Sequence, residues 1–266
     1  IRRPPRSTLS SSSAASDVYK RQVIGCANND DFIDCDSEEN CPLFYGTIFV
    51  APETLTESDP TFFESIISIE DANREMFDRR VDGWINIKPY LFEANFSDNL
   101  KIEVQVNPEF GTKEKAKQVA LQYLTAIGRM PSYLRKDVET IWLHDGNENY
   151  GGGNKNLLIH HVRTEEYVQK GILEETFMHE AVHTSLDEYH LFSEEWINAQ
   201  GKDIGFISEY AMEFPQREDL AETYPICFGL KYKPSAFKKE VREKIFEMIP
   251  NRLEYCDKYF FDGLGY

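Results

Sequence analysis

Five residues, His179-Glu180-Ala181-Val182-His183, constrain this chain more than any other stretch. On an α-helix, side chains four residues apart project from one face, so the two imidazoles can reach the same metal ion. The glutamate beside the first histidine is then placed to act as general base toward a water on that ion. The motif predicts a catalytic zinc site with His179 and His183 as ligands and Glu180 as base. The alternative is an amphipathic helix that carries two surface histidines.

The residues around the motif favour the metal site. Residues 172–190 contain neither glycine nor proline, and Glu174 and Glu175 stand in the first turn, where the helix dipole favours acids. On a helical wheel, the face opposite the two histidines carries Leu173, Phe177, Ala181 and Thr184. We therefore expect a helix over 172–190 with one face in the core and the other along a cleft.

A catalytic zinc needs a third protein ligand and an open position for water. Asp187 follows His183 by one turn, so it is better placed to hold an imidazole than to bind the ion. The segment over 215–222 offers better carboxylates, since Pro215 suits a first helical turn and Glu218 and Glu222 then share one face. Two like charges at this spacing favour a cation between them; the alternative is a solvated acidic helix face.

Taken in order along the chain, the segments HEAVHTSLD, ISEYA and EDLAE resemble the gluzincin peptidases, in particular the branch of the anthrax lethal factor catalytic domain and Pro-Pro endopeptidase. The resemblance covers about residues 100–232. It implies that Glu218 is the third zinc ligand, that Glu222 stands behind the ligands, and that Tyr210 donates to the oxyanion of a tetrahedral intermediate. Two departures bear on substrate preference. The interior of the HExxH motif is Ala-Val rather than Phe-Gly, and Pro225 should kink or end the glutamate helix.

The remaining pattern predicts an α+β fold of the zincin type, with a small mixed sheet, an edge strand, the active-site helix and a helical C-terminal part. Residue spacing predicts strands over 101–106, 139–144 and 157–161, and a helix over 112–130. Residues 151–156 predict a flexible turn, and we expect the strand over 157–161 to be the edge strand that pairs with an extended peptide. Alternation lets at most one of His160 and His161 line the cleft.

Composition divides the chain into residues 1–22, 23–42, 43–100 and 101–266. Residues 1–22 are basic and serine-rich and resemble a translated sequencing-adapter artefact, so we leave them out of the fold. Residues 43–100 predict a β-rich N-terminal extension, with a strand over 47–51, loop and helix over 65–79, and an extended stretch over 84–96. Residues 101–266 hold the predicted catalytic domain. Within it we expect a cleft wall at Trp196, a helix over 234–249, and a tail docked by Tyr255, Tyr259, Phe260 and Phe261.

Three of the five cysteines lie in an acidic stretch over 26–41, which we interpret as a tether. Val23-Ile24-Gly25-Cys26 fits a bacterial lipobox, which would make Cys26 a lipid anchor. Alternatively, the stretch resembles acidic cysteine-containing repeats of secreted proteins, some of which bind Ca²⁺, although the spacing is not that of an EF-hand loop. Both interpretations place the protein outside the cell. If Cys26 is lipidated, the remaining four cysteines permit two disulfides, which we expect between Cys35 and Cys41 and between Cys227 and Cys256; if it is not, one thiol is left over.

The formal net charge of −17 limits the classes of partner that this chain is expected to bind. So acidic a surface disfavours nucleic acids and anionic membranes and suits a basic or neutral peptide. No stretch reaches the ~18 apolar residues of a membrane helix. We expect a secreted or surface-anchored zinc endopeptidase that cleaves a peptide or protein substrate with a zinc-activated water and Glu180 as general base. The alternative is a non-catalytic extracellular binding module that keeps the zincin fold.

Overall fold

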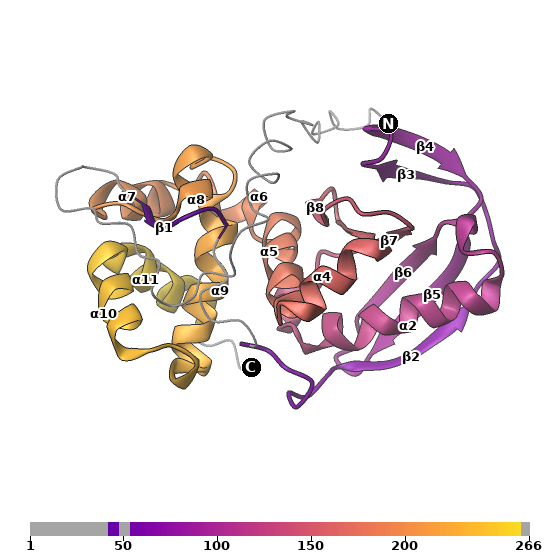
Figure 1. The fold of residues 1–266 in the computed structure, drawn as a ribbon, viewed down its shortest axis with the longest axis horizontal. Helices are drawn as coiled ribbons and strands as arrows, with labels where there is room; N and C mark the ends of the chain where they lie inside the picture. The colour runs from indigo at the N-terminus through magenta and orange to yellow at the C-terminus, as the bar shows by residue number, and fades with distance from the viewer. Residues whose placement is uncertain (1–41, 48–53, 262–266) are drawn as a thin grey trace.

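The computed structural model describes residues 42–47 and 54–261. The chain forms a sheet part and a helical part, and helix α5 (Leu173–Ser185) lies between them (Figure 1). The fold therefore mixes helices and strands around a mixed sheet, as the sequence predicts. The predicted tether and its cysteines, Cys26, Cys35 and Cys41, lie outside the described residues.

The main sheet has six strands in the order β2-β5-β6-β7-β9-β8. Their bounds are β2 Phe63–Ser68, β5 Tyr90–Phe96, β6 Lys101–Val106, β7 Thr140–His144, β8 Gly151–Gly153 and β9 Asn156–His160. Strands β6, β7 and β9 pair in parallel, whereas β2, β5 and β8 pair antiparallel with their neighbours. The strands predicted over 101–106, 139–144 and 157–161 are confirmed to within a residue. The domain boundary predicted at residue 100 runs through this sheet, because β2 and β5 precede it.

Strand β9 is buried at every position, and the glycine segment β8 forms the outer edge. The expectation that residues 157–161 form the edge strand is therefore wrong, and so is a turn over the whole of 151–156. The turn is confined to Asn154 and Lys155, which have positive φ angles of 47° and 60° and close a tight hairpin between β8 and β9. Glycine's weak strand propensity hid β8 in the sequence, and only the pairing with β9 makes it a strand.

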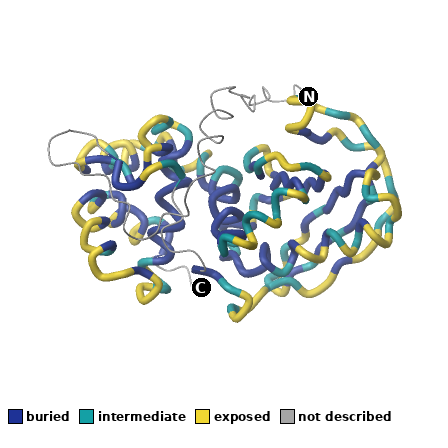
Figure 2. The backbone as a smooth tube through the Cα atoms, in the orientation of Figure 1, coloured by how far each residue is buried: buried dark blue, intermediate teal, exposed yellow. Residues whose placement is uncertain are grey.

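Both faces of the sheet are covered, which explains the apolar runs in its strands. Helix α2 (Lys113–Arg129) packs on one face through Ala116, Ala120, Tyr123, Leu124 and Ile127, and the side chain of Thr112 caps its first turn. The helix predicted over 112–130 is thus confirmed. The hairpin of β3 (Arg74–Asp78) and β4 (Gly83–Ile87) contributes Met76 and Phe77 to a small core with Trp142 and Leu158. The buried stretches of the chain follow these contacts (Figure 2).

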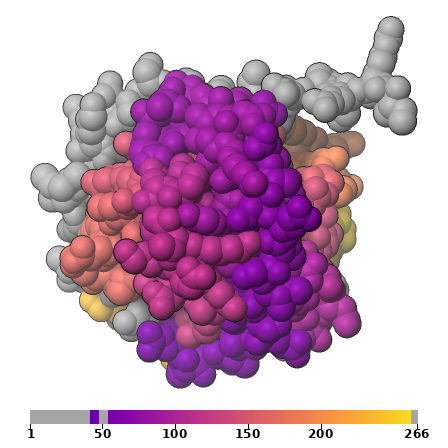
Figure 3. Space-filling view, turned by 90° about the vertical axis from the view of Figure 1, so that its right-hand side faces the viewer, coloured from indigo at the N-terminus to yellow at the C-terminus, as the bar shows by residue number. Residues whose placement is uncertain are grey.

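The helix expected within residues 65–79 does not form, because these residues belong mostly to β2 and β3; the expected loop is confined to residues 69–73 between them. Neither strand alternates cleanly, since β2 is largely exposed and β3 buries three consecutive residues at its end. The extended stretch predicted over 84–96 is confirmed as β4 and β5. The N-terminal strands and α2 together make up much of the molecular face at the sheet end (Figure 3). The strand predicted over 47–51 lies almost wholly outside the described residues.

The helical part follows α5 in the chain, whereas the short helices α3 and α4 precede α5. The helical part consists of the helices α6 to α11. The bounds of all these helices are α3 Ser132–Arg135, α4 Thr164–Gln169, α6 Asp187–His190, α7 Glu194–Lys202, α8 Glu209–Glu213, α9 Asp219–Tyr232, α10 Lys239–Met248 and α11 Pro250–Cys256. Strand β1 (Pro42–Phe44) joins this part by pairing in parallel with β10 (Phe206–Ser208), directly before α8. The helix predicted over 172–190 is divided at Leu186 into α5 and α6. The helix predicted over 234–249 is confirmed in its second half as α10, after a 3-10 turn over Pro234–Ala236.

Helix α9 begins later and ends later than predicted. Pro215 lies before the helix, and Glu218 occupies the N-cap position rather than the second turn. The helix continues through Pro225 to Tyr232, so the proline does not end it. Tertiary packing outweighs the lost hydrogen bond, because α9 is buried from Asp219 to Gly229. Tyr255, Phe260 and Phe261 are buried in the same core, as expected for a docked tail. Among the described residues, no helix has the length and apolar character needed to cross a bilayer.

Candidate metal centre

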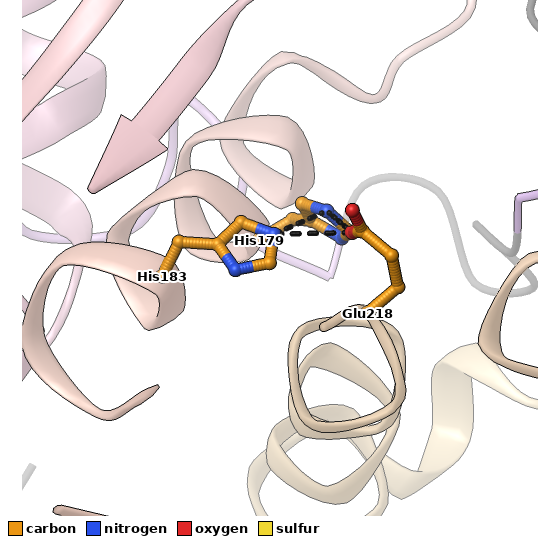
Figure 4. Close-up of side chains that lie close together, drawn as sticks. All are labelled: His179, His183 and Glu218. Atoms are coloured by element: carbon orange, nitrogen blue, oxygen red, sulfur yellow. Dashed lines mark hydrogen bonds and ion pairs between the residues drawn. The ribbon is translucent and has the colours of Figure 1, made fainter. Parts of the chain in front are cut away.

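Three side chains from two helices converge at one point between the sheet part and the helical part. Helix α5 supplies His179 and His183, and the N-terminus of α9 supplies Glu218 (Figure 4). The two Nε2 atoms lie 3.3 Å apart, and Glu218 Oε2 lies 3.3 Å from that of His179 and 3.1 Å from that of His183. All three side chains are buried or nearly so. The structure thus brings together the three residues that the sequence nominates as metal ligands.

The spacing of these three atoms fits one metal ion. A tetrahedral site with metal–ligand bonds of about 2.0–2.1 Å holds its ligand atoms roughly 3.3 Å apart. The observed separations of 3.1–3.3 Å therefore need no rearrangement to accept an ion. Two imidazoles and one carboxylate suit zinc, but other divalent transition metals accept the same ligands. The geometry supports a metal site without selecting the metal.

Each imidazole is held by a carboxylate on its other nitrogen. Glu222 Oε1 lies 3.2 Å from His179 Nδ1, and Asp187 Oδ2 lies 2.8 Å from His183 Nδ1. Such contacts place the proton on Nδ1 and direct the Nε2 lone pair toward the point where a metal ion would bind. Glu222 is itself held by Ser208, whose Oγ donates to its second oxygen at 2.8 Å. Asp187 and Glu222 thus take the supporting positions expected from the sequence.

The two oxygens of Glu218 have different neighbours. Oε2 faces the imidazoles, whereas Oε1 accepts from the phenol of Tyr210 at 3.0 Å and from Arg217 Nε at 2.6 Å. Arg217 also donates to the Tyr210 oxygen at 3.3 Å. Sequence reasoning missed Arg217 and Ser208. Arg217 had one available signal, a guanidinium directly before a proposed ligand, while the role of Ser208 depends on the fold.

The charges around the centre favour a cation within it. Burial alone would lower the pKa of His179, but its contacts with Glu218 and Glu222 raise that pKa to about 10. Burial likewise opposes charge on His183, and Asp187 and Glu218 outweigh it, so that the pKa of His183 is raised. Burial raises the pKa of Glu218, but the two imidazoles bring it well below its ordinary value. The carboxylates therefore need positive charge, which either protons or a divalent ion can supply.

The edge strand lies directly against the helix that carries the motif. A Cβ atom at Gly152 would lie 1.9 Å from the carbonyl oxygen of Glu180, so only glycine allows this approach. Thr184 fastens the hairpin to α5: its Oγ1 accepts from Gly153 N and donates to Asn156 O, both at 2.8 Å. Glu180 is 8% exposed. The strand edge and the general-base candidate are therefore neighbours.

Other residues singled out in the sequence lie elsewhere. Trp196 is 1% exposed and packs on Tyr255, so it belongs to the core of the helical part and is not a cleft wall. His160 is fully buried beside His144, and His161 contacts Tyr123 and Phe110, so neither reaches the centre.

Cys227 in α9 and Cys256 in α11 form the expected disulfide. The bond ties the glutamate helix to the C-terminal helices. The other expected pair, Cys35 and Cys41, and the acidic stretch considered for Ca²⁺ lie outside the described residues.

Comparison with known proteins finds no matching protein-family model, no matching curated protein and no matching solved structure.

Proposed function

We propose that this protein is a zinc-dependent endopeptidase of the gluzincin type, with one zinc ion per chain bound by His179, His183 and Glu218. The convergence of these three ligand atoms at tetrahedral spacing is the observation that carries the proposal. The position of α5 between a mixed sheet and a helical part also agrees with a zincin-like fold.

The chain's own residues suit the hydrolysis of a peptide bond. Zinc in such a site polarises a carbonyl and lowers the pKa of water. Glu180, between the two ligands on α5, is the residue to take the proton of the attacking water. Burial and the nearby charge of Glu218 raise the pKa of Tyr210, so its phenol keeps a proton to donate to an oxyanion. Asp187 and Glu222 hold the imidazoles in orientation.

The edge strand favours an extended peptide as substrate. Strand β8 ends the sheet, and among the described residues no strand pairs with its outer edge. An extended chain can add to such an edge through main-chain hydrogen bonds, which gives affinity without demanding particular side chains. The net charge of −17 suits a basic or neutral peptide.

The proposed location is outside the cell, secreted or held at the surface by a lipid on Cys26. The disulfide between Cys227 and Cys256 supports an oxidising compartment.

Two measurements test the proposal. Metal analysis of the purified chain should find about one zinc per chain, and Glu218→Ala should weaken binding more than Asp187→Ala, because only Glu218 is a ligand. Incubation with a diverse peptide library, analysed by mass spectrometry, should then reveal cleavage by the wild type. Glu180→Gln should keep zinc and lose cleavage by about 10²- to 10⁴-fold. A wild type that binds zinc but cleaves nothing in the library would instead support a non-catalytic binding module.

A further inference from the structure

Arg217 is a basic residue at the candidate centre that contacts both the third ligand candidate and Tyr210. Its Nε donates to Glu218 Oε1 at 2.6 Å, and another guanidinium nitrogen donates to the Tyr210 oxygen at 3.3 Å. The guanidinium also lies 4.4 Å from the centre of the Phe214 ring. One arginine therefore links the third ligand to the proposed oxyanion donor.

The backbone around Arg217 is fixed in place. The carbonyl oxygen of Phe214 accepts from the backbone N–H groups of both Arg217 and Glu218, at 3.0 and 2.8 Å. These bonds close a tight turn between α8, which carries Tyr210, and α9, which Glu218 caps. The guanidinium thus occupies a defined position and retains about a third of its exposure. The guanidinium therefore holds the carboxylate while it keeps part of its contact with solvent.

Tyr210 faces two demands that conflict. In the structure its O–H donates to Glu218 Oε1, but as an oxyanion donor it must turn toward the substrate. Without another donor, that turn would leave Oε1 of a buried carboxylate short of a hydrogen bond, which is costly. Arg217 already donates to the same oxygen at the shorter distance. It can keep Oε1 satisfied when Tyr210 leaves.

We propose that Arg217 is a positioning residue with two effects. This inference rests on the proposed zinc site. Arg217 holds Oε1 so that Glu218 binds the ion through Oε2 alone, and it releases Tyr210 to donate to the substrate. Lysine cannot reproduce both contacts, because an ammonium lacks the planar fork that reaches two acceptors in fixed geometry.

The first test uses zinc and cobalt ions and requires no substrate. Arg217→Gln should weaken zinc binding by about 10- to 100-fold in a chelator competition, as loss of a residue supporting a metal ligand typically does. It should also change the visible spectrum of the Co²⁺-loaded chain, since Glu218 can then bind through both oxygens. Arg217→Lys should restore part of the affinity. The matched control is Arg74→Gln, which removes an equally exposed arginine from a carboxylate pair with Glu103, away from the centre.

The second test separates the two effects. A peptide cleaved by the wild type is compared across Arg217→Gln, Tyr210→Phe and the double variant. Arg217→Gln should lower kcat in the wild-type background and have no further effect on kcat once Tyr210 is phenylalanine. Its loss of zinc affinity should persist in both backgrounds. Zinc saturation and a thermal unfolding measurement confirm that each variant is loaded and folded.

The outcomes distinguish this inference from the proposed function. A wild type that does not bind zinc overturns the proposed function. A wild type that binds zinc, with Arg217→Gln matching it in affinity and Co²⁺ spectrum, overturns the role of Arg217 alone. Equal losses of kcat in both Tyr210 backgrounds overturn the release of Tyr210.

Discussion

The structure buries two pairs of histidines, and the pairs differ in nearly every respect but burial. His179 and His183 stand on successive turns of α5, with ring centres 5.0 Å apart and both Nε2 atoms directed at Glu218. His144 and His160 end the neighbouring parallel strands β7 and β9, with rings stacked at 5.6 Å. The first pair flanks the candidate metal position beside Glu218, whereas the second pair is part of the core.

Carboxylates account for the difference. In the second pair, Asp78 lies 3.7 Å from His144 and 3.6 Å from His160, too far for hydrogen bonds, and Arg80 donates to both of its oxygens. Burial, followed by the neighbouring His144, lowers the pKa of His160 to about 4, and burial lowers that of His144. The pKa values of His179 and His183 are raised. Similar burial thus yields a cation-seeking pair where three carboxylates face the rings and Arg217 contacts only one of them, and a neutral pair where the one nearby carboxylate is already paired with Arg80.

The largest expected effect is on metal binding. His183→Ala removes one of three ligands and should reduce zinc from about one per chain to near zero after dialysis, as measured by elemental analysis. His160→Leu should leave the zinc content unchanged, because His160 is not part of the centre. Loss of zinc in His160→Leu, with the fold intact, would show that the two pairs are not independent.

Removal of the disulfide should affect the candidate centre at His179 and His183, and not the pair of His144 and His160. The bond closes a loop with a sequence separation of 29 residues, so the double variant Cys227→Ala, Cys256→Ala should lose about 3–4 kcal/mol of unfolding free energy. Zinc affinity should fall as well, because α9 carries Glu218 and Glu222. Denaturant titration and chelator competition measure the two effects. Unchanged zinc affinity in the double variant would mean that α9 is positioned without the bond.

Acid should destabilise the fold through His160. The unfolded chain binds this proton near pH 6.5 and the folded chain near pH 4, so stability is complete above pH 6.5 and is lost as the pH falls to about 4. The loss attributable to His160 is up to about 3 kcal/mol. It should vanish from the pH profile of His160→Leu, measured by denaturant titration. The charged and titratable groups that act on His160 are His144, Asp78 and Arg79, and all three are retained in His160→Leu.

A smaller difference should separate the two members of the neutral pair. His144 Nδ1 lies 3.0 Å from the Asn107 amide nitrogen, and its Nε2 lies 3.1 Å from the carbonyl oxygen of Phe77. Neither ring nitrogen of His160 has a hydrogen-bond partner among the described residues. His144→Leu should therefore cost about 1–3 kcal/mol more than His160→Leu, since it leaves two buried groups unsatisfied. Equal losses at pH 7 would contradict this assignment of the hydrogen bonds.

The two histidines of the candidate centre were predictable because their geometry is local. The i,i+4 spacing alone places His179 and His183 on one face of a helix, wherever that helix packs. Helix α2 and strands β6, β7 and β9 followed from residue periodicity for the same reason. Asp187 follows His183 by four residues, so its contact with that ring also follows from local spacing.

Contacts between distant segments were not predictable in this way. Glu218 and Glu222 could be nominated by motif, but only the packing of α9 on α5 directs Glu218 to both imidazoles and Glu222 to the other nitrogen of His179. The edge strand was missed because Gly151–Gly153 has no side-chain pattern, and its position depends on pairing with β9 and on the close approach of Gly152 to α5. Trp196 was misplaced because periodicity cannot say what a buried face packs against.

Local spacing was enough to place two imidazoles on one helix face, since covalent geometry and the helical repeat require it. Which carboxylate completes the set, which arginine holds it and which histidines stay neutral depended on how the helices and strands pack. Those outcomes depend on electrostatic and packing contacts between segments far apart in the chain, whose meeting no local pattern specifies.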